Sequence, residues 1–235
     1  MEIKQFFKTV ISCVYPNTCL DCGEIIAEGE FFCDYCFEML ARINHDKQCI
    51  KCGLDKKDCG CKNKIYSFDA ITAPFYNRGS AQSAVYTYKF QKRQYISRFL
   101  AEQMSLAAKY VFYGIGFDGI CYVPLSGKSL RKRGFDQSLE IARRMSRILG
   151  IPLIENQLVC RNKKKSQHKV PLKMREKNVK DVYFSTRPIS GKILLVDDIK
   201  TTGATLNECS KQLLSSGAKA VYCITALITE KDRKE

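Results

Sequence analysis

The chain has 235 residues, 45% of them hydrophobic, which is enough to build a buried core and argues against a disordered protein. Its formal net charge of +15 is unevenly placed: residues 1–64 hold nine basic and ten acidic residues, whereas residues 65–235 hold 30 and 14. Such a basic surface favours polyanions, either nucleic acid or a phosphorylated small molecule. No apolar stretch reaches the roughly 20 residues that span a bilayer, and no cleavable leader is recognisable, so we expect a cytoplasmic protein without a transmembrane segment.

The first residues have apolar side chains at helical spacing from Ile3 to Val14, and the pattern ends near Pro16. This spacing predicts a short amphipathic helix that packs on its own domain. A helix that docks on a partner or a membrane surface is the alternative, but Lys4 and Lys8 are few basic residues for that role.

Eight of the 13 cysteines occur as closely spaced pairs between Cys19 and Cys61. Paired cysteines in a cytosolic chain indicate metal binding and not a disulfide framework. The predicted zinc ligands are Cys19, Cys22, Cys33 and Cys36 in one set, and Cys49, Cys52, Cys59 and Cys61 in the other. Four thiolates leave zinc no open position, so we expect a structural ion and not a catalytic one. The first set predicts one zinc ion; the second ends in a tighter Cys-x-Cys pair, and both a second ion and crossed pairing between the sets stay open.

The other five cysteines lie in apolar or helical contexts, where a cysteine is most often a buried hydrophobic residue. They are Cys13, Cys121, Cys160, Cys209 and Cys223. We therefore expect all of them to be buried and none to bind metal.

After the cysteine module, which ends near Lys64, strand-like and helical patterns alternate. The predicted strands are Ala70–Phe75, Ile120–Val123, Ile193–Val196 and Val221–Ile228, and the predicted helices are Tyr95–Tyr113, Asp136–Leu149 and Ala204–Ser216. A glycine follows each helix, at Gly114, Gly150 and Gly217, where a left-handed closing residue is favoured. We therefore predict a cysteine-rich zinc-ribbon module over residues 1–64 and an α/β domain over 65–235, a mostly parallel sheet with flanking helices. Within it, Arg161–Lys180 is strongly basic and predicts a surface loop.

The most specific motif runs from Ile193 to Leu206, where a buried strand is followed by two carboxylates and a hydroxyl-rich turn into a helix. A phosphate among Thr201–Thr205 would receive hydrogen bonds from the free backbone N–H groups at the helix start. Asp197 and Asp198 would repel that phosphate, so their natural partners are ribose hydroxyls or a hydrated magnesium ion. Together these features predict a site for a phosphorylated sugar.

This motif resembles the phosphoribosyl pyrophosphate signature of type I phosphoribosyltransferases, and the resemblance extends the predicted fold to theirs. It implies that Asp197 and Asp198 are the catalytic pair that holds the ribose 2′ and 3′ hydroxyls. It also implies that a five-residue cradle wraps the 5′-phosphate, and that Mg²⁺ accompanies the phosphoribosyl pyrophosphate. The cradle residues are Thr201, Thr202, Gly203, Ala204 and Thr205.

A second loop after a strand, Val123–Ser129, occupies the place where this fold binds pyrophosphate. Glycine permits close approach, and serine hydroxyls and basic side chains can neutralise a diphosphate. The predicted ligand-binding residues are Ser126, Gly127, Lys128 and Arg131. The alternative is that the basic residues here form a solvated helix entry, which would account for Lys132 and Arg133 without a ligand.

Further motifs spread over most of the chain resemble the ComF family. They are the cysteine module after Pro16, Tyr88-Lys89-Phe90, Arg133-Gly134-Phe135 with Gln137, and Gln167, Arg175 and Asn178. Ser126-Gly127 and Asp136 depart from the residues usual in the family. The resemblance implies a competence protein that takes part in DNA uptake inside the cell, contacts single-stranded DNA and works with proteins of the uptake machinery.

Two other functions remain open. An ordinary salvage phosphoribosyltransferase would transfer the ribosyl phosphate to a nucleobase, although no segment predicts a base pocket. A non-catalytic regulator would use the bound phosphoribosyl ligand as a signal. The hypothesis of single-stranded DNA binding depends on aromatic residues that lie near basic ones and predict a stacking surface. They are Tyr86, Tyr88, Phe90 and Tyr95.

Overall fold

The computed structural model describes residues 16–61, 64–91, 93–161 and 182–230, and the statements below refer to these residues. The predicted N-terminal helix, Cys13 and nearly all of the basic segment 161–180 lie outside them. No helix in the described part of the chain is long and apolar enough to cross a bilayer.

The centre of the molecule is a parallel sheet, as predicted. Its strands are β1 (Ala70–Thr72), β2 (Phe75–Tyr76), β3 (Gly119–Tyr122), β6 (Lys192–Lys200) and β7 (Ala220–Ile228). The order is β1-β7-β6-β3, and β2 also pairs with β7. We predicted one strand over Ala70–Phe75, but two short strands form because Pro74 has no N–H to donate to a ladder.

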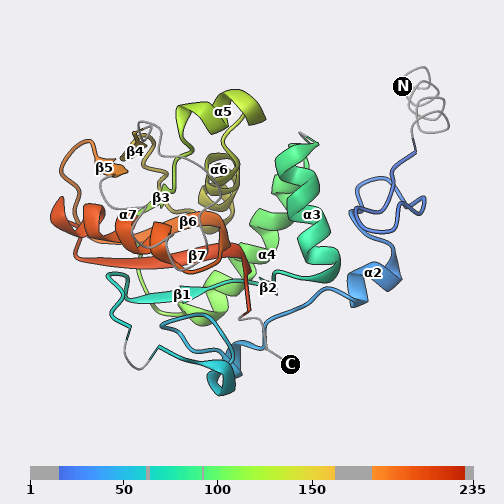
Figure 1. Cartoon of the computed structure of the whole chain (residues 1–235), viewed down its shortest axis with the longest axis horizontal. Helices are drawn as coiled ribbons and strands as arrows, with labels where there is room; N and C mark the ends of the chain where they lie inside the picture. Colours follow the sequence, from blue (N-terminus) through green and yellow to red (C-terminus); the bar gives the residue numbers. More distant parts are fainter. Residues whose placement is uncertain (1–15, 62–63, 92, 162–181, 231–235) are drawn as a thin grey trace, which may run out of the picture.

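Helices cover both faces of the sheet (Figure 1). Three helices pack on one face, α3 (Gly79–Phe90), α4 (Ile96–Val111) and α6 (Gln137–Leu149). The opposite face carries α7 (Ala204–Ser215) and the antiparallel pair β4 (Leu158–Cys160) and β5 (Tyr183–Ser185). A short helix, α5 (Gly127–Arg133), follows β3. The sequence predicts three of the four long helices and misses α3, whose many small residues give no clear apolar stripe.

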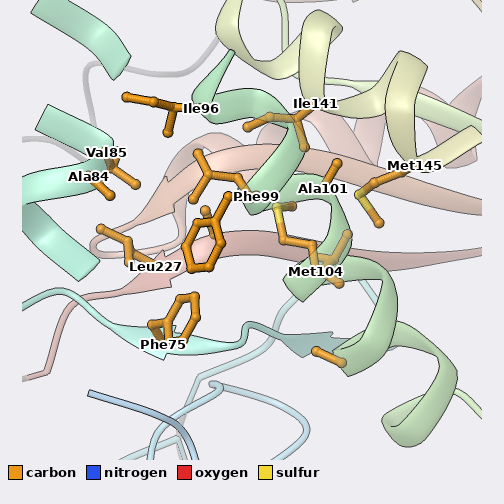
Figure 2. Packing of buried hydrophobic residues seen from close by; sticks show 14 of the residues in the cluster. Phe75, Ala84, Val85, Ile96, Phe99, Ala101, Met104, Ile141, Met145 and Leu227 are labelled. Atoms are coloured by element: carbon orange, nitrogen blue, oxygen red, sulfur yellow. The ribbon is translucent and has the colours of Figure 1, made fainter. Parts of the chain in front are cut away.

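The larger core lies between the sheet and α3, α4 and α6 (Figure 2). Phe99 of α4 stacks on Phe75 of β2, with ring centroids 5.9 Å apart. Met104 of α4 and Ile141 of α6 are fully buried beside it. The helical layer is therefore held to the sheet mainly by apolar packing, which fixes where each helix delivers its polar ends.

The cysteine module forms two parts that pack on different sides of the domain. The first ribbon, residues 16–40, contains α2 (Asp34–Glu38) and packs on α3 and α4. The second ribbon, residues 41–61, contains the 3-10 turns η1 (His45–Lys47) and η2 (Lys56–Asp58) and packs on the β1–β2 edge and the end of β7. Figure 1 shows the first beside α3 and the second beneath β1.

Candidate functional site

Each set of four predicted zinc ligands brings its sulfur atoms together. Within each set the four sulfurs lie no more than 4.8 Å from one another. The Cys22 and Cys33 sulfurs are 3.7 Å apart, as are those of Cys49 and Cys61. A tetrahedron with Zn–S bonds of about 2.3 Å has an edge of about 3.8 Å, so both sets fit a zinc ion. The sets are separate in space, and pairing across them is not the arrangement that the chain adopts.

A cleft of about 530 Å³ opens beyond the carboxyl ends of β3 and β6. Adjacent parallel strands bring the loop after β3 to the same edge of the sheet as the end of β6, since Tyr122 lies opposite Val196. The charged residues that line the cleft are Lys89, Lys128, Arg133, Arg161, Asp197 and Asp198. Four cations against two carboxylates suit a ligand with several negative charges.

Asp197 points into the protein at the carboxyl end of β6. One of its carboxylate oxygens accepts hydrogen bonds from the Ser138 hydroxyl (3.1 Å) and from the backbone N–H of Asp198 (2.8 Å). Burial, together with the negative charge of Asp198, raises the pKa of Asp197 to about 8. Burial and the neighbouring charge thus favour the protonated form of Asp197 more than they would for an exposed carboxyl group.

Asp198 has a different environment from its neighbour. Its Oδ2 lies 2.8 Å from the ammonium group of Lys89, at the end of α3, and 4.0 Å from the Arg133 guanidinium. Both members of the Lys89–Asp198 pair are largely buried, with side chains 13% and 12% exposed. No local sequence pattern indicates this pair, because α3 and β6 are distant in the chain.

The loop after β3 is held in place by capping residues. Ser126 caps α5, accepting a hydrogen bond from the N–H of Ser129. Asp136 caps α6 by accepting from Leu139 N–H (3.2 Å), and its second oxygen accepts from Leu125 N–H (2.9 Å). Asp136 therefore ties this loop to α6, a task that a single side chain can do because a carboxylate has two acceptor oxygens.

The turn into α7 has the conformation that a phosphate cradle needs. Gly203 adopts a left-handed φ of +84° immediately before the helix. The Thr202 hydroxyl accepts a hydrogen bond from Ala204 N–H at 3.3 Å, within the turn. N–H groups in the first turn of an α-helix lack intrahelical partners, so the start of the 12-residue α7, from which Thr205 lines the cleft, favours an anion.

The cleft includes only some of the predicted ligand residues. Among the described residues that line it are five of them, Ser126, Lys128, Thr205, Asp197 and Asp198. Arg131 is exposed on α5 and does not line the cleft, whereas Arg133, which we had set aside, does. Cys160 also lines it and is only partly buried, so our prediction that it is buried was wrong; Cys121, Cys209 and Cys223 are buried as expected. Cys160 stays at the rim because β4 ends there.

Comparison with known proteins agrees with this architecture. The model of the double zinc ribbon domain matches residues 10–66, and that of the phosphoribosyl transferase domain matches residues 136–235. "DNA utilization protein YhgH" of Escherichia coli is 26% identical over 89% of this chain and 96% of its own length. "Competence protein ComFC" of Streptococcus pneumoniae is 29% identical over 80% of this chain and 82% of its own. The chain therefore combines a double zinc ribbon with a phosphoribosyl transferase domain, the arrangement by which it resembles the ComF family.

Solved structures resemble the chain more distantly. Glutamine phosphoribosylpyrophosphate amidotransferase of Bacillus subtilis, complexed with ADP and GMP, aligns with a TM-score of 0.37 and 19% identity. The alignment covers 55% of this chain and 26% of that one, about a quarter of its length.

Two motifs by which the chain resembles ComF proteins meet beside the cleft. The Tyr88 hydroxyl donates to the backbone carbonyl of Gln137 (3.0 Å), and its ring packs on Phe135. Arg133 donates to the Gln137 side chain (2.8 Å) and lies over the ring of Phe90, 5.9 Å from its centroid. The end of α3 and the α5–α6 junction are therefore fastened together, which fixes the position of Lys89 between them.

The predicted aromatic stacking surface is smaller than expected. Tyr86 and Phe90 are 60% and 51% exposed, and their ring centroids lie 4.7 Å apart. Tyr95 is also exposed, and its hydroxyl accepts from Arg93 at 3.4 Å. Tyr88 is fully buried, so its inclusion was wrong: it faces the core because α3 turns it away from Tyr86.

Proposed function

We propose that this chain binds phosphoribosyl pyrophosphate, or a related phosphoribosyl nucleotide, in the cleft at the carboxyl edge of its sheet. The observation that carries the proposal is the convergence of the acidic pair, four basic side chains and Thr205, at the start of α7, on one cleft. A ribose that carries a 5′-phosphate and a diphosphate needs all three kinds of partner. Carboxylates accept from its hydroxyls, cations neutralise the diphosphate, and a helix start binds the 5′-phosphate.

In this proposal each element of the cleft has one task. The pair Asp197 and Asp198 accepts hydrogen bonds from the ribose hydroxyls, and the turn Thr201–Thr205 surrounds the 5′-phosphate. Ser126, Gly127 and Lys128 hold the diphosphate, with Arg133 adding charge from within the cleft and Arg131 from outside it. Mg²⁺ accompanies the diphosphate as its counter-ion. The two cysteine clusters hold structural zinc, whose closed thiolate sites take no part in chemistry.

Calorimetric titration of the zinc-loaded protein with phosphoribosyl pyrophosphate and magnesium tests the proposal. We expect binding by the native chain and its loss in the Asp197→Asn, Asp198→Asn double variant, checked for folding by circular dichroism. Glu102→Gln is the matched control, because Glu102 is an exposed carboxylate of α4 paired only with Arg98 among the described contacts. Absence of binding by well-folded native protein would refute it. Release of pyrophosphate in the presence of a nucleobase would identify a transferase, and binding without release would favour a sensor.

We also propose that the chain serves DNA uptake in the cytoplasm by contacting single-stranded DNA, alone or with uptake proteins. Two relatives carry the words "competence" and "DNA utilization" in their names. Tyr86 and Phe90 offer two exposed rings beside the basic cleft, and a ring stacked on a base contributes about 1–3 kcal/mol.

Fluorescence anisotropy with labelled oligothymidine tests the DNA contact. The Tyr86→Ala, Phe90→Ala double variant should weaken binding at least about tenfold, the loss of one to two stacked bases. Tyr113→Ala is the control, because Tyr113 is 91% exposed but lies far from the cleft. It follows α4 near the amino-terminal ends of the strands, where Phe112 packs on Tyr222 of β7. Equal affinities of the three proteins would contradict a stacking surface on α3.

A further inference from the structure

Lys89 occupies the place at the acidic pair where a divalent cation would sit. Its ammonium group lies 2.8 Å from Asp198 Oδ2, and both side chains are largely withdrawn from solvent. One oxygen of Asp197 is also occupied, because it accepts from Ser138 and from the Asp198 N–H. The pair thus presents one carboxylate that already has a cationic partner and one that is hydrogen-bonded to its own surroundings.

The helix that carries Lys89 is held at both of its ends. At the first turn of α3, the hydroxyls of Ser80 and Ser83 each donate to Asp21 at 2.6 Å. At its last turn Tyr88 is fully buried and bonded to Gln137. The backbone that carries Lys89 is therefore fixed, and pairing costs only the rotamer freedom of the lysine side chain itself.

A magnesium ion fits this arrangement poorly. Mg²⁺ requires near-octahedral oxygen ligands at about 2.0–2.1 Å, and Asp198 Oδ2 is already paired with Lys89. Displacing the ammonium group would leave a buried lysine without its carboxylate, which is strongly unfavourable. The second cation, Arg133 at 4.0 Å, would also repel an incoming divalent ion.

We propose that Lys89 replaces a divalent cation at the acidic pair, so that the cleft binds the ribose 5-phosphate part of its ligand without magnesium. The inference rests on the proposed function and narrows it. Magnesium is then required only to neutralise a diphosphate that the ligand itself brings. Sugar phosphates without a diphosphate, such as ribose 5-phosphate and nucleoside 5′-monophosphates, become ligands in magnesium-free solution. In the ion pair the carboxylate accepts from a hydroxyl while the ammonium group donates to one, so both partners serve the sugar.

Electron paramagnetic resonance with Mn²⁺ alone, in the absence of any sugar, tests the replacement directly. We expect zinc-loaded native protein and Asp198→Asn to bind Mn²⁺ equally, because Lys89 already pairs with the Asp198 carboxylate in the native protein and the variant lacks that carboxylate. Lys89→Gln should gain one site that the Lys89→Gln, Asp198→Asn double variant lacks. A native site that Asp198→Asn removes would overturn the inference, and so would a folded Lys89→Gln protein that gains none.

Titration with ribose 5-phosphate supplies the second arm. Its affinity for the native protein should change less than about twofold when magnesium is added, whereas Lys89→Gln should bind about tenfold more weakly in magnesium-free buffer, the loss of one charge-assisted contact. Lys89→Arg keeps the charge and should restore most of the affinity. Native binding that requires magnesium would overturn the inference while leaving the proposed function intact. If no phosphoribosyl compound binds under any condition, the proposed function fails and the Mn²⁺ measurement still decides the role of Lys89.

Discussion

The two ribbons have the same four-thiolate chemistry but are attached to the domain in different ways. The first ribbon is held mainly by side chains: Asp21 accepts from two serines of α3, and Arg98 of α4 donates to the Gly29 carbonyl. The second ribbon is held by the backbone, since Ile71 N–H donates to the Ile50 carbonyl at 2.7 Å. Backbone pairing makes the second ribbon an extension of the sheet edge, whereas the first is a separate piece docked on helices.

Because the attachments differ, loss of structure in either ribbon should affect a different part of the domain. Gln48 of the second ribbon is buried, donates to the Gly53 carbonyl and accepts from Thr72 of β1. Unfolding of this ribbon would therefore remove a hydrogen-bond partner of the sheet itself. Unfolding of the first ribbon would remove the Asp21 contacts of α3, the helix whose last turn places Lys89 in the cleft. We therefore expect the second ribbon to govern stability and the first to govern ligand affinity.

Removing one thiolate from each ribbon should give the largest difference. Cys52→Ser and Cys22→Ser should each lose one equivalent of zinc, measured by a colorimetric chelator. Cys52 is buried at 4% exposure against Ile228 and Leu54, whereas Cys22 is exposed. Cys52→Ser should lower the free energy of unfolding by about 4 kcal/mol or more, because metal and core packing are lost together. Cys22→Ser should leave the main thermal transition near its native temperature. Equal losses would mean that attachment does not matter.

A glycine in each ribbon supplies a matched pair with a smaller effect. Gly53 and Gly23 follow the second cysteine of a Cys-x-x-Cys pair, with φ of +77° and +79°. A methyl group at Gly53 would overlap the side chain of Ile228, whereas one at Gly23 meets no other atom within 4 Å. Gly23→Ala should cost about 1–2 kcal/mol from the left-handed backbone alone, and Gly53→Ala about 1–3 kcal/mol more from overpacking.

Chemical denaturation of the three proteins, native and both variants, measures these costs. The glycine comparison separates packing from backbone conformation, since φ is the same at both positions. If the two variants were equally stable, Ile228 would have room to move and the second ribbon would be less tightly joined to β7 than its contacts indicate.

Much of this arrangement could be predicted from local patterns. The cysteine spacing indicated both sets of thiolates, and the alternation of strands and helices predicted the parallel sheet, because each signal is contained in a few neighbouring residues. Long-range charge pairing left no such signal. Lys89 appeared only as part of a triplet near aromatic residues, and Arg133 appeared to belong to a solvated helix.

The misses have a common physical cause. Arg131 and Arg133 are two residues apart on the short helix α5, so they point to different sides, and composition alone cannot say which one faces the cleft. The same holds for Tyr86 and Tyr88 on α3, one exposed and one buried. Sequence patterns therefore indicated the kinds of side chain at the cleft and on α3, but not which individual residues face the cleft or the solvent.

The smallest predicted effect tests the path from the first ribbon to the cleft. Asp21 and Asp34 each lie between two zinc-binding cysteines of the first ribbon, but only Asp21 accepts hydrogen bonds from α3 among the described contacts. These two serine hydroxyls lower the pKa of Asp21, so it is charged at neutral pH and stabilises the positive end of α3. Asp21→Asn should cost about 1 kcal/mol of stability, whereas Asp34→Asn should cost less than about 0.5 kcal/mol.

The informative readout is ribose 5-phosphate affinity in magnesium-free buffer. If α3 transmits the position of Asp21 to Lys89, Asp21→Asn should weaken binding two- to fivefold, about 0.4–1 kcal/mol, with full zinc content retained. Asp34→Asn keeps native affinity on the same reasoning. Because the stabilisation by Asp21 depends on its charge, it is lost as the pH falls through its lowered pKa, so native and Asp21→Asn proteins should converge in stability in acid. Unchanged affinity in Asp21→Asn would show that the Tyr88 end of α3 alone positions Lys89, and that the first ribbon is docked without being coupled to the cleft.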